Sequence, residues 1–223
     1  MLSNLCGRYL TKPYRFTPQF TFCPYERLHF LVLLFCAIID LKDSGQGLIH
    51  MKIRKCCKED ITLVGEFYDH TVKHLCENIN YPKWTYKEYP SENSVRKMTE
   101  EGSQFMCTDN DEIVGAFVLN DDPQGEYENA AWSRQLTRGQ YMVCHTLATK
   151  PLLQGKGIGR KLVEFCIDYA RKHGYQAIRL DVVPDNFPAR RLYERCGFVY
   201  VGDVDLERDI EDIPVFSMYE LNL

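Results

Sequence analysis

Leu153-Gln154-Gly155-Lys156-Gly157-Ile158-Gly159-Arg160-Lys161 is the stretch that decides the fold of this chain. Its three glycines stand at alternate positions, where residues without a Cβ let the backbone turn sharply and point several N–H groups one way. The apolar spacing that follows predicts a helix from Gly157 to His173. Because a helix N-terminus carries unpaired N–H donors and about half a positive charge, the stretch predicts a cradle for an anion such as a phosphate.

Three kinds of glycine-rich loop compete for this stretch. A nucleotide P-loop needs Ser or Thr after its lysine, and neither Lys156 nor Lys161 is followed by one. The dinucleotide fingerprint needs Gly-x-Gly-x-x-Gly near the start of a βαβ unit, whereas these glycines alternate and lie late in the chain. The pattern that remains is Gln-x-x-Gly-x-Gly, with Gln154 as its first residue. It resembles the coenzyme A pyrophosphate loop of the GNAT acetyltransferase superfamily, and a plain tight turn is the alternative.

Two flanking segments extend this resemblance over residues 51–223. The segment Leu147-Ala148-Thr149-Lys150-Pro151 ends a predicted strand that begins at Tyr141, and it is similar to the segment that leads into the GNAT loop. Residues 186–198 resemble the GNAT segment Asn-x-x-Ala-x-x-Leu-Tyr-x-x-x-Gly-Phe. In a helix, Asn186, Ala189 and Tyr193 fall on one face. A helix cap and a core tyrosine would explain these residues equally well if they stood alone.

The resemblance implies a fold and a coenzyme site. The fold is α/β, or more strictly α+β, with a mostly antiparallel mixed sheet, a splayed parallel strand pair and flanking helices. The coenzyme is acetyl-CoA as co-substrate, without a metal, and its pantetheine arm would pair with the backbone of the first strand in the splay. The implied binding residues are Leu147, Ala148, Thr149, Gln154, Gly155, Lys156, Gly157, Ile158, Gly159, Arg160, Asn186, Ala189 and Tyr193.

The resemblance also implies the chemistry, which is direct attack of a primary amine on the thioester in a ternary complex. Tyr193 is the expected general acid for the departing thiolate. Some GNAT enzymes place a glutamate where this chain has Val143, so His145 is the candidate base, with a packed histidine as the alternative. Cys144 is a weaker candidate nucleophile, because strand alternation places it on the other face from His145. Two alternatives to a small-molecule enzyme are an acyl-CoA sensor or inactive homologue and a protein N-terminal or lysine acetyltransferase.

The acceptor leaves only indirect traces in the sequence. The connection over residues 78–90 is aromatic, and in GNAT-like proteins it borders the acceptor pocket. Tyr127 and Trp132 are expected to be surface aromatics at a loop end, although both could reach the pocket. An acidic rim near the C-terminus would favour a cationic amine, with a plain solvated loop as the alternative. Its residues are Asp203, Asp205, Glu207, Asp209, Glu211 and Asp212.

Composition sets limits on the class of protein. The 223 residues are 45% hydrophobic and 26% charged, as in a globular domain, and the net charge of -4 disfavours a nucleic-acid surface. The ten cysteines show no Cys-x-x-Cys pair, which favours reduced thiols in a cytoplasmic protein. His70 and His74 lie one helical turn apart without a third metal ligand nearby. The expected partner is a small amine or a peptide amine, and a homodimer is left open.

The first fifty residues differ from the rest. The apolar run over residues 30–39 is shorter than the roughly 20 residues that span a bilayer, so a membrane span is not expected, with attachment to a membrane or organelle by this extension as the alternative. Residues 1–50 are therefore interpreted as an N-terminal extension, and residues 51–223 as the acetyltransferase domain. Beyond the segments above, we expect helices over 60–77 and 91–102 and strands over 104–107, 112–119, 177–183, 199–204 and 214–221.

Overall fold

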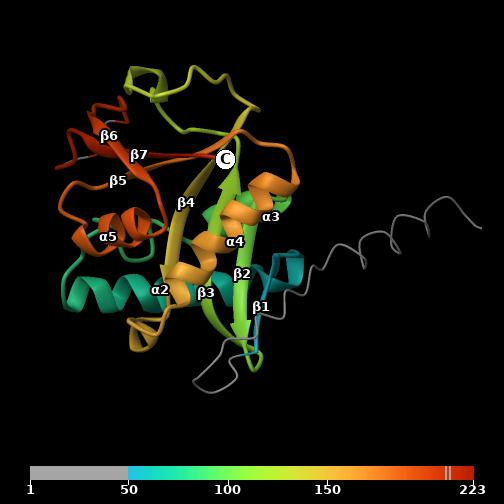
Figure 1. The fold of residues 1–223 in the computed structure, drawn as a ribbon. Coiled ribbons are helices and arrows are strands. Elements are labelled where there is room, and N and C mark those ends of the chain that lie inside the picture. Colours follow the sequence, from blue (N-terminus) through green and yellow to red (C-terminus); the bar gives the residue numbers. More distant parts are fainter. Residues whose placement is uncertain (1–49, 209, 211) are drawn as a thin grey trace, which may run out of the picture. The chain divides into compact units, whose positions relative to one another are not determined.

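The computed structural model describes residues 50–208, 210 and 212–223. Within them, seven strands form one sheet in the order β1-β2-β3-β4-β5-β7-β6 (Figure 1). Every neighbouring pair is antiparallel except β4 and β5, which are parallel. The predicted mixed sheet is thereby confirmed. The strands are β1 (Met51–Lys55), β2 (Gln104–Asp109), β3 (Glu112–Asn120), β4 (Tyr141–Thr149), β5 (Ala177–Val182), β6 (Val199–Val204) and β7 (Phe216–Asn222).

Helices cover both faces of the sheet. On one face, the buried residues of α2 (Ile61–Glu77) pack against inward side chains of β2, β3 and β4. Helix α3 (Glu92–Glu100) lies against α2. On the other face, α4 (Ile158–Lys172) and α5 (Phe187–Arg195) share a second core cluster. Three short 3-10 turns complete the described elements: η1 (Lys58–Asp60), η2 (Tyr127–Asn129) and η3 (Pro151–Leu153).

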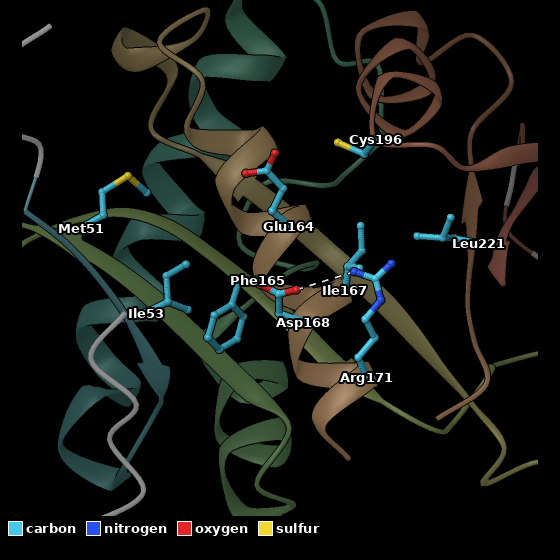
Figure 2. Close-up of a pocket in the computed structure, with 9 residues that line it drawn as sticks. All are labelled: Met51, Ile53, Glu164, Phe165, Ile167, Asp168, Arg171, Cys196 and Leu221. Carbon is cyan, nitrogen blue, oxygen red and sulfur yellow. Dashed lines mark ion pairs between the residues drawn. The ribbon is translucent and has the colours of Figure 1, made fainter. Parts of the chain in front are cut away.

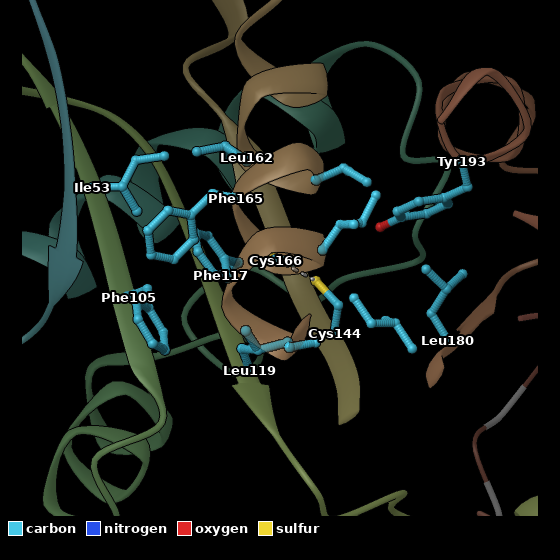
Figure 3. Close-up of a cluster of buried hydrophobic side chains, with 14 of the residues drawn as sticks. Ile53, Phe105, Phe117, Leu119, Cys144, Leu162, Phe165, Cys166, Leu180 and Tyr193 are labelled. Atoms are coloured by element: carbon cyan, nitrogen blue, oxygen red, sulfur yellow. Dashed lines mark hydrogen bonds between the residues drawn. The ribbon is translucent and has the colours of Figure 1, made fainter. Parts of the chain in front are cut away.

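The core beneath α4 fixes that helix on the sheet (Figure 3). Phe105 and Phe117 stack with ring centroids 5.1 Å apart, and Leu162 of α4 is fully buried. Cys144 of β4 and Cys166 of α4 approach within 4.0 Å between their sulfurs. Because these contacts tie α4 to the central strands, the helix N-terminus is held in a fixed place beside β4.

The central strand β4 is irregular in two ways. Its pairing with β3 shifts around Thr146, which has the left-handed φ of 49° and accepts a hydrogen bond on its carbonyl from the Tyr68 hydroxyl at 2.9 Å. Its pairing with β5 covers only Tyr141 to Val143, although β4 continues to Thr149 and β5 to Val182. The two parallel strands therefore separate beyond Val143, as the resemblance implied.

Most of the predicted element bounds agree with the structure to within three residues. Between β2 and β3 the turn is shorter than expected, because Asp109 already pairs with Glu112 and only Asn110 and Asp111 turn, both at positive φ. The interpretation of Tyr127 and Trp132 as surface aromatics is wrong, because they are 1% and 8% exposed and belong to the core. Residues 1–49 of the extension predicted over residues 1–50, and the rim residues Asp209 and Glu211, lie outside the described residues.

Candidate functional site

A cleft of about 1410 Å³ follows the gap between β4 and β5. Its lining comes from the end of α2 and the aromatic connection after it, the loop after β3, the second half of β4, the glycine loop, the end of β5, α5 with the residues before it, and the segment between β6 and β7. We call the described residues of this last part, 205–208, 210 and 212–215, the closing segment. Tyr81, Trp84 and Tyr89 line the cleft, so the aromatic connection borders it as expected.

The glycine loop presents free backbone donors to this cleft. Gly155 and Gly157 have φ of 81° and 80°, which an L side chain rarely adopts, and Gly157 is the N-cap of α4. The first backbone bond of the helix runs from the Lys161 N–H to the Gly157 carbonyl. Five residues of this stretch line the cleft and, within the described chain, donate no backbone hydrogen bond through their N–H groups. They are Gly155, Gly157, Ile158, Gly159 and Arg160.

Gln154 also lines the cleft, but Lys156 is separated from the other predicted loop residues. The Lys156 N–H already donates to the Leu153 carbonyl at 3.3 Å, and its residue is absent from the cleft lining. The alternating turn at Gly155 and Gly157 directs the residue between them away. The loop can therefore bind an anion through glycine and helix N–H groups without Lys156.

The open edge of β4 supplies a second row of backbone groups. The Lys150 N–H donates to the Val114 carbonyl on the β3 side. The backbone N–H and C=O groups of successive strand residues point to opposite edges of the strand. The groups of Thr149 therefore point toward β5, those of Ala148 toward β3, and those of Leu147 toward β5 again. Since β5 has separated here, these groups face the cleft, which Leu147, Ala148 and Thr149 all line.

Helix α5 closes the opposite wall. The Asn186 side-chain oxygen caps the helix by accepting from the Ala189 N–H at 3.2 Å, which leaves its amide NH2 group for another partner. Tyr193 is 7% exposed, lines the cleft and points its hydroxyl toward α4 and β4 (Figure 3). Burial raises the pKa of Tyr193 well above its ordinary value, so the phenol holds its proton. All three predicted α5 residues thus meet at the cleft.

His145 lines the cleft from the other face of β4 than Cys144, as strand alternation predicted. Its Nε2 lies 2.9 Å from the Asp122 carbonyl oxygen, which can only accept, so Nε2 carries a proton. In the neutral ring, Nδ1 is then the basic atom. Burial lowers the pKa of His145 below its ordinary 6.5 and outweighs the negative charge of Asp181, which raises it. The imidazole is therefore neutral at pH 7.

A largely buried ion pair beside His145 was missed by the sequence reasoning. Asp181 of β5 and Arg208 of the closing segment form two hydrogen bonds of 2.9 Å, and the Tyr127 hydroxyl donates to the same carboxylate at 2.6 Å. Burial opposes ionisation of Asp181, but the Arg208 charge outweighs it, and the pKa of the carboxyl lies below its usual range. Of the predicted acidic rim, Glu207 lines the cleft, while Asp203 accepts from the Ser217 hydroxyl.

A separate hollow of about 360 Å³ lies between β1 and the outer side of α4 (Figure 2). Its apolar floor includes Met51 and Phe165, and its rim carries the Asp168–Arg171 ion pair at 3.8 Å. None of the predicted site residues lines it.

Over the described ranges there is no group of three candidate metal ligands, and no helix there is long and apolar enough to cross a membrane.

The sequence model of the acetyltransferase (GNAT) family matches this chain over residues 72–198. L-methionine sulfoximine/L-methionine sulfone acetyltransferase of Salmonella typhimurium is 29% identical over 69% of this chain and 83% of its own length. An uncharacterized N-acetyltransferase of Methanocaldococcus jannaschii is 27% identical over 66% of this chain, which spans only 59% of that relative. N-alpha-acetyltransferase RimI of Mycobacterium tuberculosis is 41% identical over 26% of this chain and 35% of its own length.

Solved structures share the fold. An acetyltransferase of the GNAT family from Streptococcus agalactiae superposes with a TM-score of 0.64, covering 78% of this chain and 96% of its own, at 16% identity. An acetyltransferase of Salmonella typhimurium, solved with its cofactor acetyl-CoA, gives a TM-score of 0.56 over 78% of this chain and 94% of its own, at 21% identity. At these identities the likeness concerns the fold.

Proposed function

The chain belongs to the GNAT family of acetyltransferases, and on that premise we propose that its cleft transfers an acetyl group from acetyl-CoA to the nitrogen of an amine. One observation carries the proposal. The unpaired N–H groups at the start of α4 and the unpaired edge of β4 line the same cleft, so a diphosphate and an amide-bearing arm can bind together. The solved relative from Salmonella typhimurium, which contains acetyl-CoA, supports this donor.

The donor binds through backbone groups in this proposal. The pyrophosphate accepts hydrogen bonds from the N–H groups of the glycine loop, where the α4 dipole adds favourable charge. The pantetheine amides pair with Leu147 and Thr149 as an added strand would. The NH2 group of Asn186 is available to donate to the arm, and the small side chain of Ala189 leaves room for the arm against α5.

Acyl transfer then requires stabilisation of the tetrahedral intermediate. Its oxygen gains negative charge when the amine attacks the thioester carbon. A strand N–H at Leu147, which points into the gap beside the irregular residue Thr146, is our candidate donor to that oxygen. The fixed backbone geometry means that this group needs no reorganisation during the reaction.

The attacking amine must lose a proton. An amine with a pKa near 10 is only about 0.1% neutral at pH 7, which costs roughly 4 kcal/mol. We assign the base to Nδ1 of His145, directly or through a water, because the bond from Nε2 to the Asp122 carbonyl fixes the tautomer that leaves Nδ1 unprotonated. The aromatic side chains of Tyr81 and Trp84 border the same space and suit an amine with some apolar body.

The departing thiolate receives a hydrogen bond and then a proton from Tyr193. The buried phenol keeps its proton until the sulfur becomes negative, and no other described residue is hydrogen-bonded to its hydroxyl. Tyr193 is therefore the general acid of the proposal. The cleft is also compatible with a peptide amine, and the partial match to an N-alpha-acetyltransferase is the reason to include peptides among the acceptors tested.

The test is thiol release from acetyl-CoA by the full chain with amino acids, polyamines, small amines and peptides as acceptors. We expect at least one class to raise release well above hydrolysis, and Tyr193→Phe to lower kcat by about 10²-fold with an unchanged KM for acetyl-CoA. Tyr175→Phe, at a tyrosine outside the cleft, is the matched control and should keep full activity. Binding of acetyl-CoA without release for any amine would instead identify a sensor.

The seven described cysteines are all free thiols. Four of them, including Cys107 and Cys166, are buried in the core. We therefore propose the cytoplasm, a compartment that keeps thiols reduced, as the place where the protein works.

A further inference from the structure

Arg208 makes more polar contacts than a surface arginine of a loop would. Besides its two bonds to Asp181, its Nε donates to the Gln124 carbonyl at 2.6 Å and its Nη2 to the Pro123 carbonyl at 3.3 Å. The guanidinium also lies over the Phe216 ring, 4.8 Å from its centroid. The side chain is 18% exposed, so most of the charge is removed from water.

These contacts join three segments that are far apart in the sequence. Arg208 belongs to the closing segment, Pro123 and Gln124 to the loop after β3, and Asp181 to β5 just where that strand has left β4. Tyr127, from the same loop, holds the other side of the carboxylate. Gln124, Asp181 and Arg208 all line the cleft, so the junction forms one end of it.

The junction lies beside His145, because the Asp122 carbonyl that bonds Nε2 directly precedes the Pro123 and Gln124 carbonyls that accept from Arg208. The charged groups that face the imidazole are Asp181 from β5, Arg208 from the closing segment and Asp122 from the loop after β3. The Tyr127 phenol, which is buried and neutral, donates to the carboxylate of the same ion pair. Water is largely excluded, and opposite charges in such a place act strongly on a neighbouring titratable ring.

We propose that Arg208 and Asp181 are positioning residues of the acceptor end: the pair fastens the closing segment over the bound amine, and its two opposite charges face His145. The inference rests on the proposed function. It gives the pair two separable effects, one through the bidentate geometry of the guanidinium and one through the charges.

The two charges predict opposite pH effects. At low pH, kcat/KM should rise as His145 loses its proton, and we call this rise the acid limb. Loss of the Arg208 charge raises the proton affinity of both His145 and Asp181, so Arg208→Met should move the acid limb to higher pH by about 1 unit. Loss of the Asp181 charge removes a group that favours protonated imidazole, so Asp181→Asn should move the limb to lower pH. A purely structural role would move both variants the same way or neither.

The geometry has its own readout. Arg208→Lys keeps the charge but loses the paired bonds to Asp181, so the acid limb should stay in place while KM for the acceptor rises about tenfold and KM for acetyl-CoA stays within about twofold. This variant also preserves a partner for the buried carboxylate, so it keeps the test available should Arg208→Met fold poorly. The matched control is Arg138→Met, because Arg138 pairs with Asp122 at 3.4 Å but is 64% exposed.

The experiment measures kcat/KM against pH, and both KM values, for the full chain and these four variants with the best acceptor of the thiol-release panel. Opposite limb shifts for Arg208→Met and Asp181→Asn support the proposal. Equal or absent shifts, or an unchanged acceptor KM in Arg208→Lys, would overturn it in an otherwise active enzyme. If the unmodified chain releases no thiol with any amine, the proposed function fails, and this inference fails with it.

Discussion

A single hydrogen bond determines what His145 can do. The Asp122 carbonyl accepts from Nε2, so the basic lone pair is on Nδ1, and burial keeps the ring neutral near pH 7. A neutral imidazole is ready to take a proton from an amine, whereas a protonated one would have to lose its own first. The alternative, a packed histidine without a catalytic role, would leave Nδ1 unused in the cleft.

At this scale the first prediction concerns pH. Because the pKa of His145 in the folded chain lies below 6.5, kcat/KM should rise with pH through a midpoint below 6.5 and then level off. His145→Gln should lower the plateau by about 10²-fold and abolish this limb. His173→Gln, on the exposed end of α4, should leave the profile unchanged. An acid limb that survives in His145→Gln would assign it to another group.

Individual residues also show where sequence reasoning stopped. Helical spacing predicted that Asn186, Ala189 and Tyr193 share one face, and only the resemblance to the GNAT segment gave them an expected role. Asp181 and Arg208 were not, since their pairing depends on how β5 and the closing segment come together, and Arg208 stands within an acidic run that dominates the local pattern. Lys156, a predicted binding residue, does not line the cleft, and spacing alone does not reveal the positive φ of the glycines on either side of it; its role stays a prediction.

Among the elements, the entry to α4 and the open half of β4 together line the part of the cleft where we propose that the donor binds. The strand, loop and helix bounds followed from apolar spacing and turn residues. The irregular step in β4 did not, because Thr146 is a β-branched residue in a left-handed conformation that its sequence disfavours. The Tyr68 hydroxyl, from α2, holds the Thr146 carbonyl and so supplies a tertiary contact that local preference cannot predict.

The glycine loop gives a prediction with an internal control. Gly157 and Gly174 lie at opposite ends of α4 with φ of 80° and 78°, and an added Cβ would meet nothing within 4 Å at either position. Replacing either with alanine should therefore cost a similar 1 to 2 kcal/mol or so of backbone strain. Only Gly157→Ala should also weaken coenzyme A binding, by about tenfold, because it disturbs the N–H groups at the cleft.

Thermal denaturation and calorimetric titration with coenzyme A measure the two effects. Equal loss of stability with a selective loss of affinity in Gly157→Ala is the expected result. If both variants bind coenzyme A as the unmodified chain does, the anion is not bound by this loop.

On the scale of the whole molecule, the cleft separates strands that elsewhere form one sheet. A ligand that bridges β4, α4 and α5 should therefore stabilise the entire described domain. At a coenzyme A concentration about 100 times its Kd, we expect a gain of about 2.7 kcal/mol in the free energy of unfolding. Urea denaturation with and without coenzyme A measures this gain, with AMP at the same concentration as control. Equal stabilisation by AMP would mean that the pantetheine arm does not occupy the gap.

The central claim is that this cleft moves an acetyl group from a thioester to an amine. The most direct test incubates the full chain with acetyl-CoA labelled in the acetyl group and the best amine of the panel, and follows the label. The account predicts that the label leaves the thioester and appears in the acetylated amine, at a rate that Tyr193→Phe reduces and Tyr175→Phe does not. Label that remains in acetyl-CoA, or that appears only as free acetate, would contradict it.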